Sequence, residues 1–61
     1  MSSLAQAIVE ALQAAPLQFS EIVDQNRDVP WPEFLKAWGE VRSLPTLARD
    51  PDGRYLFKVE N

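Results

Sequence analysis

Side chains that could carry chemistry are few in this chain, and their types limit what it can do. The sequence contains no histidine and no cysteine, which removes the usual general bases, the strongest nucleophile and the soft metal ligands. The serines have no base partner, and the carboxylates stand singly. The one close acidic pair, Asp50 and Asp52, lies in a segment far shorter than a calcium loop of about twelve residues. We therefore predict that the chain is not an enzyme, uses no cofactor or metal ion, and has no small-molecule substrate.

The basic side chains are concentrated toward the C-terminus. Residues 1–40 contain six acids and two bases, a net charge of −4, whereas residues 41–61 contain four bases and three acids, a net charge of +1. The formal charge of the whole chain is −3, which disfavours general attraction to nucleic acid or anionic lipid. The C-terminal third is therefore the only part of the chain with a net positive charge.

The length and composition predict one small domain, residues 1–61. A domain of this size buries only roughly 60% of the surface of its unfolded chain, so self-association or a partner would add to its stability. The start of the chain, Met1-Ser2-Ser3, has no basic region, and no apolar run reaches membrane-spanning length. We therefore predict neither a signal peptide nor a transmembrane helix, and no membrane partner. The absence of cysteine fits a cytoplasmic location, which is our prediction.

Three helices are predicted to position the remaining side chains, and the first covers residues 3–14. Ser3 and Gln6 fit a capping box at its start, and Pro16 ends it, because the residue before a proline avoids the α region. The apolar face repeats every four residues and consists of Leu4, Ile8 and Leu12, with Ala7 and Ala11 beside them.

A second, shorter helix is predicted over residues 17–25. Gln18 is its N-cap, and Glu21 favours the positive end of the helix. Residues 26–28 then form a turn, because Asn and Asp side chains compete with helical backbone bonds. The inward residues are Phe19, Ile22 and Val23.

The third helix is predicted over residues 32–44. Pro30 and Pro32 hold Val29 and Trp31 outside the α region, since proline restricts the residue before it. Gly39 costs about 1 kcal/mol relative to alanine in a helix interior, which suggests a close approach by another backbone, with exposure to solvent as the alternative. The inward residues are Phe34, Trp38 and Val41, flanked by Leu35 and Leu44, and the outward ones are Glu33, Lys36, Ala37, Glu40 and Ser43.

A β-hairpin is predicted over residues 46–59. The sequence Asp-Pro-Asp-Gly at residues 50–53 fits a type I turn followed by a left-handed glycine and a G1 bulge. That register pairs Asp50 with Arg54, Arg49 with Tyr55, and Leu47 with Phe57. Leu47, Tyr55, Phe57 and Val59 then share one face, and Ala48, Leu56 and Lys58 share the other.

The predicted class is therefore α+β and mainly helical, with three helices followed by a C-terminal hairpin. This order, closed by Arg49-Asp50-Pro51-Asp52-Gly53-Arg54-Tyr55, resembles a minimal winged helix-turn-helix domain from Leu4 to Val59. The resemblance implies that residues 17–25 are the first helix of the helix-turn-helix unit, residues 32–44 its recognition helix, and residues 46–59 its wing. The segment from Asn26 to Trp31 is longer than the usual turn of 3–4 residues.

One functional hypothesis is a small transcriptional regulator that contacts DNA. The resemblance assigns such contacts to the recognition helix and the wing, and the bases there are Lys36, Arg42, Arg49, Arg54 and Lys58. Glu33 and Glu40 would oppose phosphate on the helix, and each is spaced to pair with Lys36. The wing arginines alternate with Asp50 and Asp52, and an ordinary exposed turn with an Asp50–Arg54 pair is the alternative.

The leading hypothesis is an interaction module that works through protein–protein contacts, either as an adaptor or as a homodimer. Leu56 is predicted to face outward, and Trp31 is predicted to lie outside the helix between its two prolines. Together with the neighbouring hairpin edge they would form an apolar patch, with Lys36 and Arg42 as charges at its rim. The alternative is that Trp31 covers the core and Leu56 is an isolated apolar surface residue.

Overall fold

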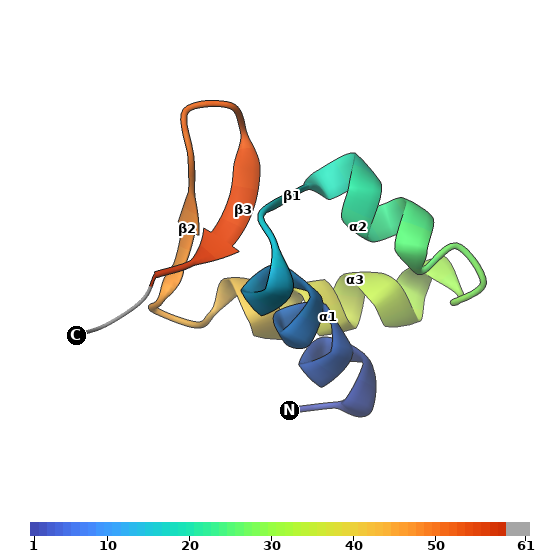
Figure 1. Cartoon of the computed structure of the whole chain (residues 1–61). Coiled ribbons are helices and arrows are strands. Elements are labelled where there is room, and N and C mark those ends of the chain that lie inside the picture. The colour runs from blue at the N-terminus through green and yellow to red at the C-terminus, as the bar shows by residue number, and fades with distance from the viewer. Residues whose placement is uncertain (59–61) are drawn as a thin grey trace.

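The described part of the chain, residues 1–58 of a computed structural model, contains three helices and one antiparallel sheet (Figure 1). The strand order is β1-β3-β2, so the last strand is central. This confirms the mainly helical α+β class, but the predicted hairpin is joined by a third strand that the sequence did not reveal. In chain order the elements are α1 (Ser3–Ala14), β1 (Leu17–Gln18), α2 (Phe19–Gln25), α3 (Trp31–Arg42), β2 (Leu47–Arg49) and β3 (Arg54–Phe57).

Strand β1 replaces the first two residues of the predicted second helix. Leu17 pairs with Tyr55 and Gln18 with Arg54, because Pro16 favours extended backbone before it and β3 offers a free edge beside it. Helix α2 therefore begins at Phe19. The predicted start signals still act there, since the Gln18 N–H donates to Glu21 Oε1 at 3.0 Å.

Helix α1 has the predicted bounds but a different cap and a rotated apolar face. Its N-cap is Ser2 instead of Ser3, and the Ser2 hydroxyl accepts from the Ala5 N–H at 3.1 Å. Ala7 is exposed, because a face that includes Val9 in its place buries a larger apolar side chain. The buried residues are Ala5, Ile8, Val9 and Leu12.

Helix α3 begins at Trp31, one residue earlier than predicted, and ends at Arg42. The backbone of Trp31 is therefore helical, although a proline follows it. Two contacts offset that bias: the Phe34 N–H donates to the Pro30 carbonyl at 3.0 Å, and the Trp31 ring stacks on Phe34. Ala37 faces the core, contrary to the prediction, since it is only 2% exposed.

The hairpin forms in the predicted register. Leu47 pairs with Phe57 and Arg49 with Tyr55, and Gly53 takes the expected positive φ of 85°. The Asp50 N–H donates to the Arg54 carbonyl at 2.9 Å, which closes the turn. Leu47, Tyr55 and Phe57 pack against the core, whereas Val59 lies outside the described residues.

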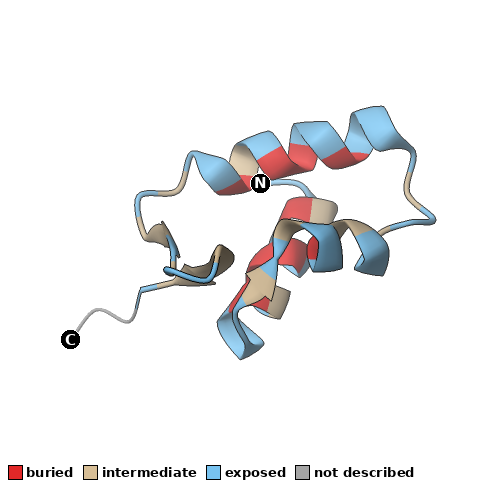
Figure 2. Cartoon of the chain, turned by 90° about the horizontal axis from the view of Figure 1, so that it is seen from above, coloured by how far each residue is buried: buried red, intermediate tan, exposed pale blue. Residues whose placement is uncertain are grey.

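A row of aromatic rings joins the helices to the sheet. Trp38 lies between Phe19, at a centroid distance of 5.3 Å, and Tyr55, at 5.0 Å. Phe19 also contacts Phe34, at 6.1 Å. Figure 2 shows the buried residues on the facing sides of the helices, with exposed residues around the outside. Helix α3 thus anchors α2 and β3 with one side and leaves its other side open.

Candidate interaction surface

The outward side of α3 carries two large apolar side chains that the fold does not cover. Trp31 is 51% exposed and Leu35 is 44% exposed. They are four residues apart in the helix and therefore lie on the same side. The stripe continues along the helix to Gly39 and Arg42, which are both exposed. We call Trp31, Leu35, Gly39 and Arg42 the α3 outer flank, and Figure 2 shows exposed residues along this outward side.

The Trp31 side chain is held in place although half of it is exposed. Its ring stacks on Phe34 with a centroid distance of 5.4 Å and an interplanar angle of 16°. Phe34 is itself only 1% exposed and belongs to the core. A partner that covers Trp31 therefore loses little side-chain entropy on binding, because the ring is already oriented.

Gly39 makes the middle of the α3 outer flank flat. A Cβ atom added at this position would have nothing within 4 Å. The suggested close approach by another backbone within the chain is therefore wrong, and the alternative of exposure to solvent holds. The surface at Gly39 is open to a side chain from outside.

Lys36 lies on the other side of α3, away from Arg42. It lines a shallow groove of about 300 Å³ together with Ser2, Leu4, Glu33, Ala37 and Glu40. Ser2 closes one side of this groove, since its hydroxyl donates to Glu40 Oε2 at 2.9 Å. Lys36 and Arg42 are six positions apart in the sequence, which places them about a third of a turn apart around the helix axis. The two predicted rim charges therefore do not border one patch.

The ion pairs predicted for Lys36 are not formed. Within residues 1–58 the ion pairs are Arg27–Asp24 at 3.5 Å and Arg54–Asp52 at 3.3 Å. Lys36 is exposed on the groove that Glu33 and Glu40 also line. The acidic groups there weaken its attraction for phosphate.

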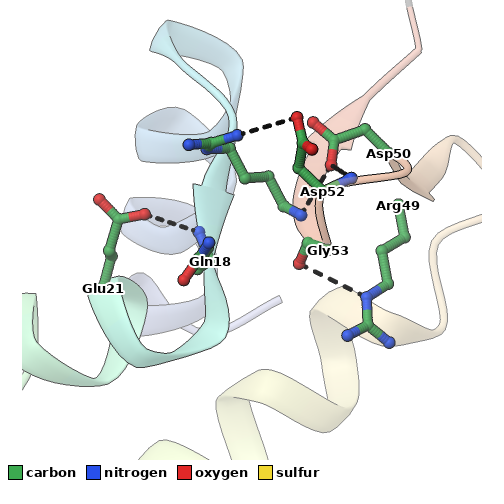
Figure 3. A network of polar contacts seen from close by, with 7 residues as sticks. Gln18, Glu21, Arg49, Asp50, Asp52 and Gly53 are labelled. Atoms are coloured by element: carbon green, nitrogen blue, oxygen red, sulfur yellow. Dashed lines mark hydrogen bonds and ion pairs between the residues drawn. The ribbon is translucent and has the colours of Figure 1, made fainter.

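The bases of the hairpin are largely engaged within the hairpin (Figure 3). The Arg49 guanidinium lies over the Tyr55 ring, with its Cζ 5.4 Å from the centroid, and its Nε donates to the Gly53 carbonyl at 3.4 Å. The Arg54 guanidinium pairs with Asp52, so the Asp50–Arg54 ion pair that the sequence offered as an alternative is not formed. Lys58 is exposed after the end of β3.

The turn itself explains why Asp50 is not available to Arg54. Its Oδ1 accepts the N–H groups of Asp52, at 3.0 Å, and Arg54, at 2.8 Å. Figure 3 shows this carboxylate at the end of the hairpin, directed at the turn backbone. The acids of the turn thus organise the loop and lie beside the arginines that the DNA hypothesis needs.

Leu56 is not part of the exposed apolar surface around Trp31. It pairs with Ala48 on the outer face of the hairpin and is half-buried. In Figure 1 the hairpin lies at one end of the molecule, whereas the connection from α2 to the start of α3 lies at the other. The structure therefore separates the two predicted patch residues, and Leu35 takes the place beside Trp31.

The sequence contained a signal for Leu35 that depends on where the helix begins. With a helix start at Pro32, Trp31 is outside the helical pattern and Leu35 is only a flanking residue. With the start at Trp31, the two are one turn apart and form a stripe.

Comparisons of this chain with models of protein families, with curated proteins and with solved structures give no match. No helix within residues 1–58 is both long enough and apolar enough to cross a membrane. In the same residues, no three acidic side chains come together as metal ligands would. A role for the chain therefore has to be inferred from its own surface.

Proposed function

We propose that this chain is a non-enzymatic, winged-helix-like interaction module that works through protein–protein contacts made by the α3 outer flank. The observation that carries the proposal is the exposure of Trp31 and Leu35 on one side of a helix that is anchored in the core. Tryptophan is enriched among the residues that dominate binding energy at protein interfaces. Contiguous apolar surface that stays exposed in a folded domain is also typical of interaction sites.

The winged-helix part of the proposal is supported by the arrangement of the elements. Helices α2 and α3 follow one another across residues 26–30, and the hairpin β2–β3 is the next element after α3. In such a domain α3 occupies the place of the recognition helix. Its outward side offers tryptophan, leucine and glycine, which suit a protein surface better than base edges, which are read mainly by hydrogen bonds.

The non-enzymatic part rests on the composition. A chain without histidine or cysteine lacks the commonest general base and the most reactive nucleophile. The absence of cysteine also supports a cytoplasmic location.

DNA binding is the second candidate function, and the concentration of bases after residue 40 favours it. Arg42 at the end of α3 and the hairpin bases Arg49, Arg54 and Lys58 would supply the phosphate contacts. Such binding weakens steeply as salt rises, because phosphate contacts release counterions. Neutralising Arg42 and Lys58 together would then reduce both the affinity and its salt dependence.

Site-specific photo-crosslinking in cells that express the chain tests the proposed function. A photoreactive amino acid at position 35 is expected to give a protein adduct, and Trp31→Ala is expected to suppress it. The same amino acid at position 13, which is exposed on α1, is the matched control. Equal adducts at both positions, or none at 35, would contradict the proposal. Binding of duplex DNA at low salt, without an adduct at 35, would favour the second candidate.

A further inference from the structure

Resting on the proposed function, we infer that the partner on the α3 outer flank is a second copy of this chain. The two α3 helices cross antiparallel around a two-fold axis, and Leu35 of each copy lies on Gly39 of the other. The interface is then isologous, with the same patch used by both copies.

The spacing of the α3 outer flank is self-complementary in this orientation. A two-fold axis that passes between Leu35 and Gly39 makes both Leu35–Gly39 contacts at once. The same axis brings Trp31 of one copy beside Arg42 of the other, because these two residues are nearly symmetric about the same point of the helix. All four residues of the flank are exposed in the single chain, so each is available for this pairing.

Gly39 gives independent support, because nothing in the single chain requires a glycine there. Its backbone has ordinary helical geometry within α3, and no atom lies where a side chain would extend. Glycine is nonetheless among the poorest helix formers. A second helix that approaches closely, with its Leu35 against the backbone at Gly39, would explain why this position is glycine. Nothing within the single chain explains it.

The charges near the two ends of α3 favour the antiparallel orientation over the parallel one. The exposed acid Asp28 lies just before the start of the helix, and Arg42 is exposed in its last turn. Antiparallel packing brings Arg42 of one copy toward Asp28 and the Trp31 ring of the other, an ion pair and a cation–π contact. Parallel packing would bring like charges together. Antiparallel helix dipoles add to the same preference.

The dimer is expected to be weak. A stable interface buries about 800 Å² on each partner, which is nearly a fifth of the 4324 Å² accessible surface of this chain. Such an interface takes roughly 20–30 residues from each side, whereas the α3 outer flank consists of four, so we expect a dissociation constant of about 10–500 µM.

Sedimentation equilibrium from about 10 µM to 1 mM protein tests the dimer over the range in which it should form. The mass is expected to rise from one chain toward two. Leu35→Glu should weaken the association by about tenfold or more. Gly39→Gln should do the same, because its side chain occupies the space that Leu35 of the other copy needs, although glutamine is a better helix former than glycine. Gln13→Glu, with the same added charge at an exposed site of α1, is the matched control and should have no effect. Helical circular dichroism of every variant shows that each remains folded.

Cysteine pairing then tests the orientation, since the natural chain has no cysteine. A mixture of Leu35→Cys and Gly39→Cys chains is expected to form the mixed disulfide in preference to either like pair. Preferred 35–35 and 39–39 disulfides would overturn the antiparallel arrangement.

Two further outcomes overturn the second copy as partner. One is a single-chain mass throughout the concentration range. The other is a dimer that Leu35→Glu and Gly39→Gln leave unchanged. If the chain stays monomeric but position 35 crosslinks in cells to a different protein, the dimer fails and the proposed function stands. If there is neither a dimer nor an adduct, both fail.

Discussion

Helix α3 carries two tryptophans, Trp31 in its first turn and Trp38 about two turns later, and their surroundings are opposite. Trp38 is 6% exposed and contacts Phe19 and Tyr55 from two other elements. Trp31 is 51% exposed and stacks on Phe34 of its own helix. The buried residues of α3, which include Trp38, thus connect the helix to the rest of the fold, whereas Trp31 and the rest of the α3 outer flank leave much of their surface uncovered. Apolar side chains that the fold does not need are candidates for function.

The largest expected effect on folding comes from the inner side. Trp38→Ala should lower the free energy of unfolding by about 3–5 kcal/mol, because it removes the ring that joins α2 to β3. A domain of this size rarely has more than about 3–5 kcal/mol to lose. We therefore expect the variant to be largely unfolded at 25 °C by circular dichroism.

Trp31→Ala is the matched change on the outer side. It should alter the free energy of unfolding by less than about 1 kcal/mol, measured by urea denaturation. A loss equal to that of Trp38→Ala would mean that both sides of α3 hold the fold together, and the distinction between them would be lost.

A smaller loss of stability is expected at Ala37, which tests whether this residue belongs to the buried side of α3. Ala37→Gln should destabilise the chain by about 1–3 kcal/mol, because it forces a polar amide into a buried position. Lys36→Gln, at the exposed neighbouring position, should change stability by less than about 0.5 kcal/mol. Equal urea midpoints for the two variants would return Ala37 to the outer side, as the sequence had predicted.

The smallest expected effect is a gain in stability, at Gly39. Gly39→Ala should stabilise the single chain by about 0.5–1 kcal/mol, since it favours the helix and meets no neighbouring atom. The measurement is thermal unfolding at low protein concentration, where the dimer is dissociated. Gly53→Ala is the contrasting control and should destabilise, because its φ of 85° is unfavourable for alanine. A loss of stability in Gly39→Ala would show that the outer side is already covered within one chain.

The elements that the sequence predicted well are those with local signals. The bounds of α1 follow from its apolar repeat and Pro16, and the hairpin register follows from Asp50 and the left-handed Gly53. Strand β1 was missed, because Leu17 and Gln18 become extended only when they pair with β3 from the other end of the chain.

The candidate surface was only partly predicted, because it also depends on contacts that the sequence does not reveal. The sequence left two alternatives for Trp31, a place in an exposed patch or a cover over the core, and a proline-based start for the helix placed it outside the helical pattern and hid its relation to Leu35. The hydrogen bond from the Phe34 N–H to the Pro30 carbonyl and the stacking of Trp31 on Phe34 favour the earlier helix start, and sequence preferences before proline do not include these contacts. The exposure of Leu56 was overestimated, because β-strand alternation indicates which face a side chain lies on but not how far its neighbours cover it.

The most direct test of the central claim follows the environment of Trp31 itself. In the Trp38→Phe variant, Trp31 is the only tryptophan, and its fluorescence reports whether the α3 outer flank is covered. The emission maximum is expected to shift to shorter wavelength as protein concentration rises from about 10 µM to 1 mM, and Leu35→Glu should abolish the shift. An emission maximum that stays at the position of exposed tryptophan over the whole range would contradict the claim that a second copy covers this side of α3.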